Sequence, residues 1–140
     1  MADREPALVQ VRAIEPREIE AAWRLLVANG CERRVATAAD LAALVARSQC
    51  SLVALDGHQV IGFLRALTDG LTNGYISMVV VAEGRRGQGV GRALVRAAMG
   101  TDAQMTWVLR AGRDGVAGFY EKLGFTRSEV AMERPGATRG

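Results

Sequence analysis

The chain has 140 residues, of which 49% are hydrophobic and 24% charged, a composition typical of one globular domain and not of a disordered chain. No apolar run approaches the roughly 20 residues that span a bilayer, and residues 1–6 lack the apolar block of a secretory signal. We therefore expect one soluble, cytoplasmic domain over residues 1–140, with a loose tail over residues 135–140.

The net charge of +3 comes almost entirely from arginine, because Lys122 is the only lysine among 18 basic residues. The arginines are spread along the chain between acidic residues, with few aromatic residues, which argues against a nucleic-acid-binding face. We expect neither nucleic acid nor a membrane as a partner. A local concentration at Arg85, Arg86, Arg92 and Arg96 suggests a ligand that carries phosphate.

Cysteine and histidine are too few for a metal centre. Cys31 and Cys50 can form at most one disulfide, and two reduced thiols are the favoured interpretation. His58, the one histidine, lies in a predicted turn, where we expect it to be exposed. No metal site is predicted.

The first half of the chain predicts a strand, two helices and a hairpin. The alternation over Leu8–Ile14 indicates a strand. Pro16 begins a helix that Gly30 ends, and Thr37 with Asp40 resembles a capping box at the start of a second helix. The apolar face of the first helix is expected at Ile19, Trp23, Leu26 and Val27.

A β-hairpin and a long apolar strand follow. Ser51–Leu55 and Val60–Thr68 are predicted strands joined by the Asp56-Gly57 turn. After a loop at Asp69–Gly74, the continuous apolar run Tyr75–Val81 predicts a strand that is covered on both faces.

The last third predicts a helix at Gly89–Met99, a buried strand at Met105–Leu109, a short helix at Asp114–Leu123 that Gly124 ends, and a final strand at Phe125–Met132. The inner face of the Gly89–Met99 helix is expected at Val90, Leu94, Ala97 and Ala98. This order predicts an α/β or α+β domain, with a mixed sheet and helices on both faces.

A glycine-rich loop joins the apolar strand to the next helix, and the chemistry is concentrated there. Glycines at positions 87, 89 and 91 allow a ligand to approach the backbone, and the free amides at the start of the helix favour an anion. The spacing fits neither a P-loop nor a dinucleotide fingerprint, because Gly89 is followed by Val90-Gly91-Arg92.

The segment Arg86-Gly87-Gln88-Gly89-Val90-Gly91 resembles the R-x-x-G-x-G acetyl-CoA signature of the GNAT superfamily of N-acetyltransferases. It follows Met78-Val79-Val80-Val81 and precedes an amphipathic helix. Phe119–Phe125 resembles a second motif of the same family. The resemblance covers Tyr75–Phe125 and is specific for the superfamily, while it leaves the acceptor open.

The resemblance implies a mostly antiparallel sheet that splays at the cofactor strand, often at a bulge, with acetyl-CoA bound where the sheet opens. Backbone groups near Val79 and Val81 would pair with the pantetheine arm, and the pyrophosphate would rest on the loop. The implied acetyl-CoA-binding residues are Met78, Val79, Val80, Val81, Arg86, Gly87, Gln88, Gly89, Val90, Gly91 and Arg92.

The resemblance also implies that Tyr120 protonates the departing thiolate, since a phenol with a pKa near 10 is protonated at neutral pH. The cofactor strand contains no carboxylate to serve as a base. Glu83, Asp69 and a water relay past Tyr75 or Ser77 stay open for that role.

The chain departs from the family pattern in three further places, one of which is Ala82 where a proline is common. Arg113 replaces a common asparagine and is a candidate phosphate contact, and the tail after Phe125 is short. A short tail leaves a sheet edge uncovered, so we state a homodimer as a hypothesis.

The expected function is acetyl transfer from acetyl-CoA to a primary amine, on a small molecule or a peptide, by direct attack in a ternary complex. The alternative is a regulatory domain that binds acyl-CoA without turnover. The acceptor would contact the two early helices, the hairpin and the Asp69–Gly74 loop, where Asp69, Glu18 or Glu20 can attract a cationic amine.

Overall fold

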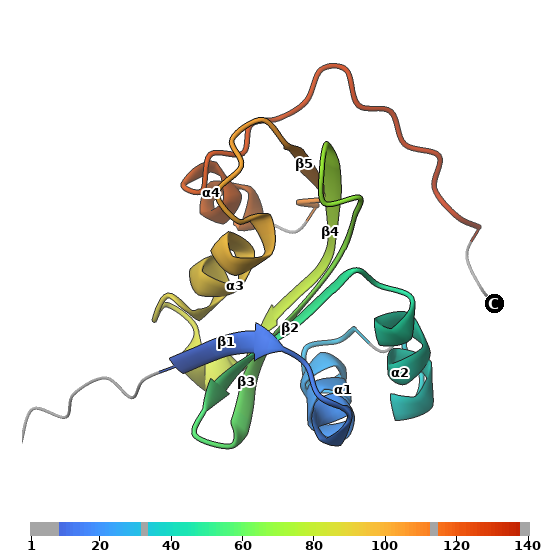
Figure 1. Ribbon diagram of the computed structural model, residues 1–140, viewed down its shortest axis with the longest axis vertical. Coiled ribbons are helices and arrows are strands. Elements are labelled where there is room, and N and C mark those ends of the chain that lie inside the picture. The colour runs from blue at the N-terminus through green and yellow to red at the C-terminus, as the bar shows by residue number, and fades with distance from the viewer. Residues whose placement is uncertain (1–8, 32–33, 113–114, 138–140) are drawn as a thin grey trace, which may run out of the picture. The chain divides into compact units, whose positions relative to one another are not determined.

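The computed structural model describes residues 9–31, 34–112 and 115–137 (Figure 1). The chain divides into two compact units, Met1–Arg110 and Ala111–Gly140, and each is described by itself. Of the predicted tail, residues 138–140 lie outside the described part, and residues 135–137 have no regular secondary structure.

The first unit is built on a five-stranded sheet whose strands lie in chain order, β1-β2-β3-β4-β5. The pairs β1–β2, β2–β3 and β3–β4 are antiparallel, and β5 is parallel to β4. This mixed, mostly antiparallel sheet with its helices confirms the predicted fold class. The strands are β1 (Val9–Ala13), β2 (Cys50–Asp56), β3 (Gln59–Thr68), β4 (Asn73–Val81) and β5 (Thr106–Leu109).

Helices cover both faces of the sheet: α1 (Ile19–Ala28) and α2 (Ala38–Ala46) lie on one side, and α3 (Val90–Met99) lies on the other (Figure 1). Neighbouring residues of a strand point to opposite faces, so Phe63 packs beneath α1 and α2 while Gly62 faces α3. A Cβ on Gly62 would lie 2.9 Å from Leu94 of α3, so this glycine lets the helix approach the sheet closely.

The helix boundaries follow local signals with one difference. Thr37 caps α2 and exchanges hydrogen bonds with Asp40, so the predicted capping box is confirmed. Pro16 instead begins a 3₁₀ turn, Pro16–Glu18, and α1 starts at Ile19.

The larger core cluster lies between the sheet and the α1/α2 layer. Its fully buried members include Phe63, Leu26, Leu41, Val35 and Val53. Both α1 and α3 contact β4, and no residue of 74–81 is exposed, which confirms that this strand is covered on both faces.

Two helix faces differ from the expectation by a small rotation. Val27, predicted on the inner face of α1, is 39% exposed. In α3, Ala97 is exposed and Val95 is fully buried, because Val95 and Leu94 together face the sheet. In β5, the predicted burial is wrong at Val108, which is 44% exposed.

The second unit contains α4 (Val116–Glu121), and Gly124 follows with a φ of 95°, as predicted for a glycine stop. Asp114, the predicted start of this helix, lies outside the described residues. The ring of Tyr120 makes edge-on contacts with Phe119 and Phe125, at centroid distances of 4.9 and 5.7 Å.

The predicted final strand at Phe125–Met132 is wrong. Residues 125–132 form no strand in the structure, and Val130 and Met132 are 90% and 98% exposed. The hydroxyl of Ser128 accepts hydrogen bonds from the backbone N–H groups of Val130 and Ala131, which makes a local turn in competition with an extended strand.

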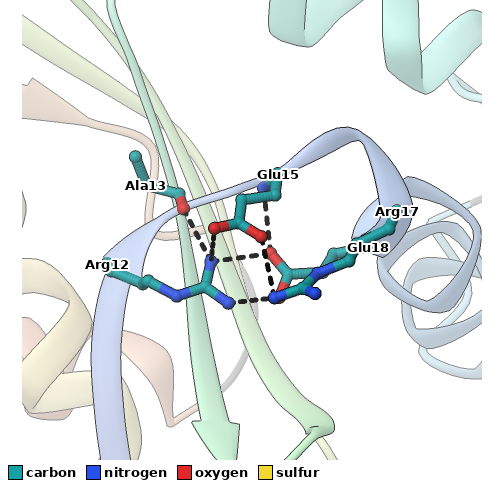
Figure 2. A network of polar contacts seen from close by, with 5 residues as sticks. All are labelled: Arg12, Ala13, Glu15, Arg17 and Glu18. Carbon is teal, nitrogen blue, oxygen red and sulfur yellow. Dashed lines mark hydrogen bonds and ion pairs between the residues drawn. The ribbon is translucent and has the colours of Figure 1, made fainter.

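A partly buried ion pair joins β1 to the start of α1 (Figure 2). Arg12 donates to both carboxylate oxygens of Glu18, at 2.8 and 2.6 Å, and Glu18 is only 7% exposed. Glu18 also accepts from the backbone N–H of Glu15, at 2.9 Å. The hydrogen bonds from Arg12 are the main cause of a pKa of Glu18 below its ordinary value.

We expect Glu18→Gln to lower the thermal unfolding midpoint by about 4–8 °C, because a charge-assisted, nearly buried hydrogen-bonded pair is lost. The control is Glu20→Gln, since Glu20 pairs with Arg24 on the surface and should shift the midpoint by about 1 °C or less. Equal shifts for the two variants would contradict the role of Glu18.

The same pair predicts a pH dependence. The pKa of Glu18 is lower in the folded state, so its contribution is present above the unfolded pKa of about 4.3 and is lost as the pH falls through the folded pKa. The stability difference between the wild type and Glu18→Gln should therefore shrink in acid, as measured by denaturant unfolding between about pH 7 and pH 3.

Candidate functional site

A bulge in β4 marks the place where the sheet opens. Arg65 of β3 pairs with Met78 and Ala66 pairs with Ile76, so Ser77 is an extra residue on β4. The pairing of β4 with β5 ends at Ile76 and Leu109. Beyond Ile76, no other strand in the described part of the chain pairs with this edge of β4.

The register shows which backbone groups this open edge presents. Ala82 donates its N–H to the carbonyl of Ile61, at 2.9 Å. Peptide groups of an antiparallel strand alternate in direction, so those of Met78 and Val80 point to β3, and those of Val79 and Val81 point to the open edge. The two backbone sites expected to bind an extended ligand are therefore on the open edge, while Met78 and Val80 are paired within the sheet.

The glycine-rich loop turns β4 into α3. It begins with a 3₁₀ turn at Glu83–Arg85, and Gly87 and Gly89 then adopt positive φ angles of 78° and 85°. Gly89 caps α3, and its carbonyl accepts from the N–H of Ala93, at 3.0 Å. The amides of the first helical turn have no partner within the helix and, with the helix dipole, favour an anion.

The remaining predicted loop residues contribute in different ways. Gln88 and Arg92 are exposed beside these amides, so both side chains are accessible to a ligand. The side chain of Val90 is 4% exposed and packs toward Gly62, so Val90 offers only its backbone. Gly91 lies in the first turn of α3 without a positive φ.

The two adjacent arginines attach the loop to different parts of the unit. Arg85 forms an ion pair with Asp56 of the β2–β3 hairpin, at 2.7 Å. Arg86 donates through Nε to the carbonyl of Val81, at 3.3 Å, and through Nη2 to Oδ1 of Asn29. Arg85 is thus a structural residue of the loop, and Arg86 lies directly at the open edge of β4.

Asn29 and Asp56 are site residues that the sequence analysis missed. Asn29 follows α1, and its Nδ2 donates to the carbonyl of Leu25, at 2.8 Å, which leaves Oδ1 to accept from Arg86. Arg86 lies 57 positions further along the chain, and no local pattern signals a contact of that separation.

Asp69 is occupied by its own loop. Its carboxylate accepts from the backbone N–H groups of Leu71, Thr72 and Asn73 and from the hydroxyl of Thr72. These hydrogen bonds, first that of the Thr72 hydroxyl, hold the pKa of Asp69 far below its ordinary value. A carboxylate that binds protons so weakly is a poor general base.

Tyr120 lies in the second unit and is 9% exposed. Its burial raises the pKa of the phenol above the ordinary value, so Tyr120 is protonated at neutral pH. Arg113, the candidate phosphate contact, lies outside the described residues.

Other site classes gain no support from the described residues. No group of three histidine, cysteine, aspartate or glutamate side chains there could hold a metal ion. The helices described here are all too short or too polar to cross a membrane. Cys31 and Cys50 are free thiols.

Comparison with known proteins identifies the arrangement. The family model described as the acetyltransferase (GNAT) domain matches residues 47–127, which is more than half of the chain. Among proteins with curated functions, none matches the chain significantly.

Solved structures of similar proteins share the fold. A putative acetyltransferase from Deinococcus radiodurans is 28% identical, with a TM-score of 0.72 over 96% of this chain and 93% of that one. Ard1 from Thermoplasma volcanium is 27% identical, with a TM-score of 0.72 over 86% and 84% of the two chains. A putative acetyltransferase from Agrobacterium tumefaciens is also 27% identical, with a TM-score of 0.72 over 91% and 99%.

We expect Gly89→Ala to destabilise the fold by about 1–2 kcal/mol, because an L side chain is strained at a φ of 85° even though the space around it is open. The control is Gly84→Ala in the same loop, which has open space and no positive φ and should change the stability by less than about 0.5 kcal/mol. Chemical denaturation measures both, and equal stabilities would show that the loop does not need this backbone conformation.

Proposed function

We propose that this chain, which belongs to the GNAT acetyltransferase family and is an acyltransferase, transfers the acetyl group of acetyl-CoA to a primary amine by direct attack in a ternary complex. The observation that carries the proposal is the open edge of β4, which leads through the glycine-rich loop to the start of α3, where free amides favour an anion. The structure of the loop is compatible with the cosubstrate that this family generally uses.

The residues present fit acetyl-CoA in two parts. The amides from Gly87 to Arg92 and the side chain of Arg86 would hold the pyrophosphate, and the peptide groups of Val79 and Val81 would pair with the pantetheine arm. Arg86 currently donates to the Val81 carbonyl, so one guanidinium joins the two parts. When bound, acetyl-CoA supplies an activated thioester, and the protein supplies orientation.

Tyr120 is the proposed acid for the departing thiolate. Its assignment rests on the match of Phe119–Phe125 to the family motif and on the burial that keeps the phenol protonated. The edge-on contacts with Phe119 and Phe125 would fix the ring within its own unit.

The incoming amine must lose a proton, and no carboxylate on β4 can accept it. Asp69 is disfavoured by its hydrogen bonds, and Glu83 lies exposed in the 3₁₀ turn after β4. We propose a water relay past Tyr75 or Ser77, both half-buried on β4.

We also propose that the protein acts in the cytoplasm as a homodimer, on a small-molecule or peptide amine. The two free thiols favour a reducing compartment. A dimer interface would cover apolar surface such as Val130 and Met132. A sedimentation mass near 15.0 kDa at micromolar concentration would remove the dimer from this proposal.

Calorimetric titration of the ligand-free protein with acetyl-CoA tests the proposal. We expect one site of micromolar or tighter affinity, and we expect Arg86→Gln to weaken it by about 10-fold, since one charge-assisted contact is lost. Arg24→Gln, which changes an exposed arginine on α1, is the matched control and should bind like the wild type. No heat and no thermal shift at millimolar acetyl-CoA would refute the proposed cosubstrate.

Tyr120→Phe should lower turnover by about 10²-fold or more while changing the Kd for acetyl-CoA by less than about twofold, because the phenol acts on the leaving group. The thermal unfolding midpoint of the variant separates a lost proton donor from a lost fold. An unchanged kcat would refute the proposed role of Tyr120.

A further inference from the structure

Arg65 lies in the middle of β3, half-buried, on the sheet face that carries α1 and α2. It shares that face with Phe63, two residues earlier, which packs in the core beneath these helices. Its Nε donates to Oγ of Ser48 at 2.7 Å, and its Nη1 donates to Oγ of Ser77 at 3.0 Å. The guanidinium is thus fixed between the end of α2 and the bulge of β4.

No carboxylate neutralises Arg65 within the described residues. Arg12, Arg24 and Arg85 each have a carboxylate partner, whereas Arg65 forms no ion pair with any described residue. Burial is the main cause of a lowered pKa for Arg65, Tyr75 opposes it and Arg34 adds to it. Arginine nevertheless stays protonated, so this half-buried cation has no counter-charge of its own.

The hydrogen bonds leave donors available for a ligand. The hydroxyl of Ser48 donates to the carbonyl of Leu44, at 2.6 Å, and accepts from Arg65, so it serves only to orient the guanidinium. The hydroxyl of Ser77 accepts from Arg65 and keeps its own hydrogen, and Nη2 of Arg65 makes no hydrogen bond to any described residue. A planar guanidinium beside a hydroxyl donor matches a carboxylate.

Arg65 also lies near the place where the reaction would occur. If the pyrophosphate rests at the start of α3, the arm of the cosubstrate runs back along β4 from Val81 toward Ser77. The four residue steps from Val81 to Ser77 span about 13 Å of strand. The reactive end of the arm would therefore approach Ser77, which Arg65 contacts directly.

We propose that Arg65, with the hydroxyl of Ser77, binds the carboxylate of the acceptor, so that the acceptor is a small amine of the amino-acid type. The inference rests on the proposed acetyl transfer and specifies its substrate class. A purely cationic amine would be repelled by Arg65, whereas a carboxylate next to the amine neutralises the guanidinium and places the nitrogen at the bulge of β4.

The test compares matched acceptors. The wild-type protein is assayed with acetyl-CoA and with the standard amino acids, each beside its own carboxamide, which keeps the amine and the side chain and removes the negative charge. We expect at least one amino acid to be acetylated, with kcat/KM at least about 10-fold above that of its amide.

Variants then assign the preference to Arg65. We expect Arg65→Gln to raise KM for the carboxylate acceptor by about 10–100-fold, with the acetyl-CoA Kd within about twofold. The kcat/KM for the amide should not fall and should rise if anything, because the variant no longer repels a cationic amine. Arg65→Lys keeps the charge without the planar fork, so its KM for the carboxylate acceptor should lie between those of the wild type and Arg65→Gln. It replaces Arg65→Gln in the test if that variant does not fold. Arg47→Gln removes an exposed arginine next to Ser48 and is the control that should leave both acceptors unaffected.

The outcomes separate this inference from the proposed function. Acetylation of amides or diamines in preference to the free acids, or an unchanged KM in both Arg65 variants, overturns the inference while acetyl transfer stands. A wild-type protein that binds no acetyl-CoA removes the proposed function and this inference together.

Discussion

The candidate site depends on the loss of one neighbouring strand, β5, in the middle of β4. Up to Ile76 the strand is paired on both edges, and after the extra residue Ser77 only β3 remains beside it. An unpaired edge inside a sheet leaves peptide groups without a partner, which is unfavourable unless a ligand or water satisfies them. In this fold the unpaired segment is short and leads directly to the start of α3, so under the proposed function the two features together bind one extended ligand.

The arginines of the first unit fall into two groups: some are paired with carboxylates and join elements, and others are held by neutral groups and keep their charge for a ligand. Arg12 and Arg85 are used to join elements, each through a carboxylate on another segment. Arg86 is joined through neutral oxygens of Asn29 and Val81, and Arg65 through serine hydroxyls. Neutral partners hold a guanidinium in place without cancelling its charge, so these two side chains are oriented and still attract anions.

The sequence predicts those parts of the structure that local chemistry determines. The Thr37 and Asp40 capping box, the Asp56-Gly57 hairpin and the glycine turn into α3 each depend on residues a few positions apart. These local signals, together with the family resemblance, predicted the arrangement of the sheet and the loop. The family resemblance implied a bulge in this strand, but neither its position at Ser77 nor the contact between Asn29 and Arg86 has a local signal, because each depends on how distant segments pack.

The errors have equally physical causes. Phe125–Met132 contains suitable apolar residues, but Ser128 forms a turn within the segment and no described strand pairs with it. The inner face of α3 was misjudged because alanine has little preference between core and surface, so Ala97 gave no reason to shift the face toward Val95.

The contact of Asn29 with Arg86 constrains how the enzyme can be re-engineered. The helices α1 and α2 form one layer, and exchanging the segment that carries them with that of a relative is an obvious way to change the acceptor. The exchange would also remove Asn29, whose side chain orients Arg86 in the loop that is proposed to bind the cosubstrate. A chimaera that keeps asparagine at position 29, with its hydrogen bond to residue 25, preserves that orientation while the rest of the layer is replaced.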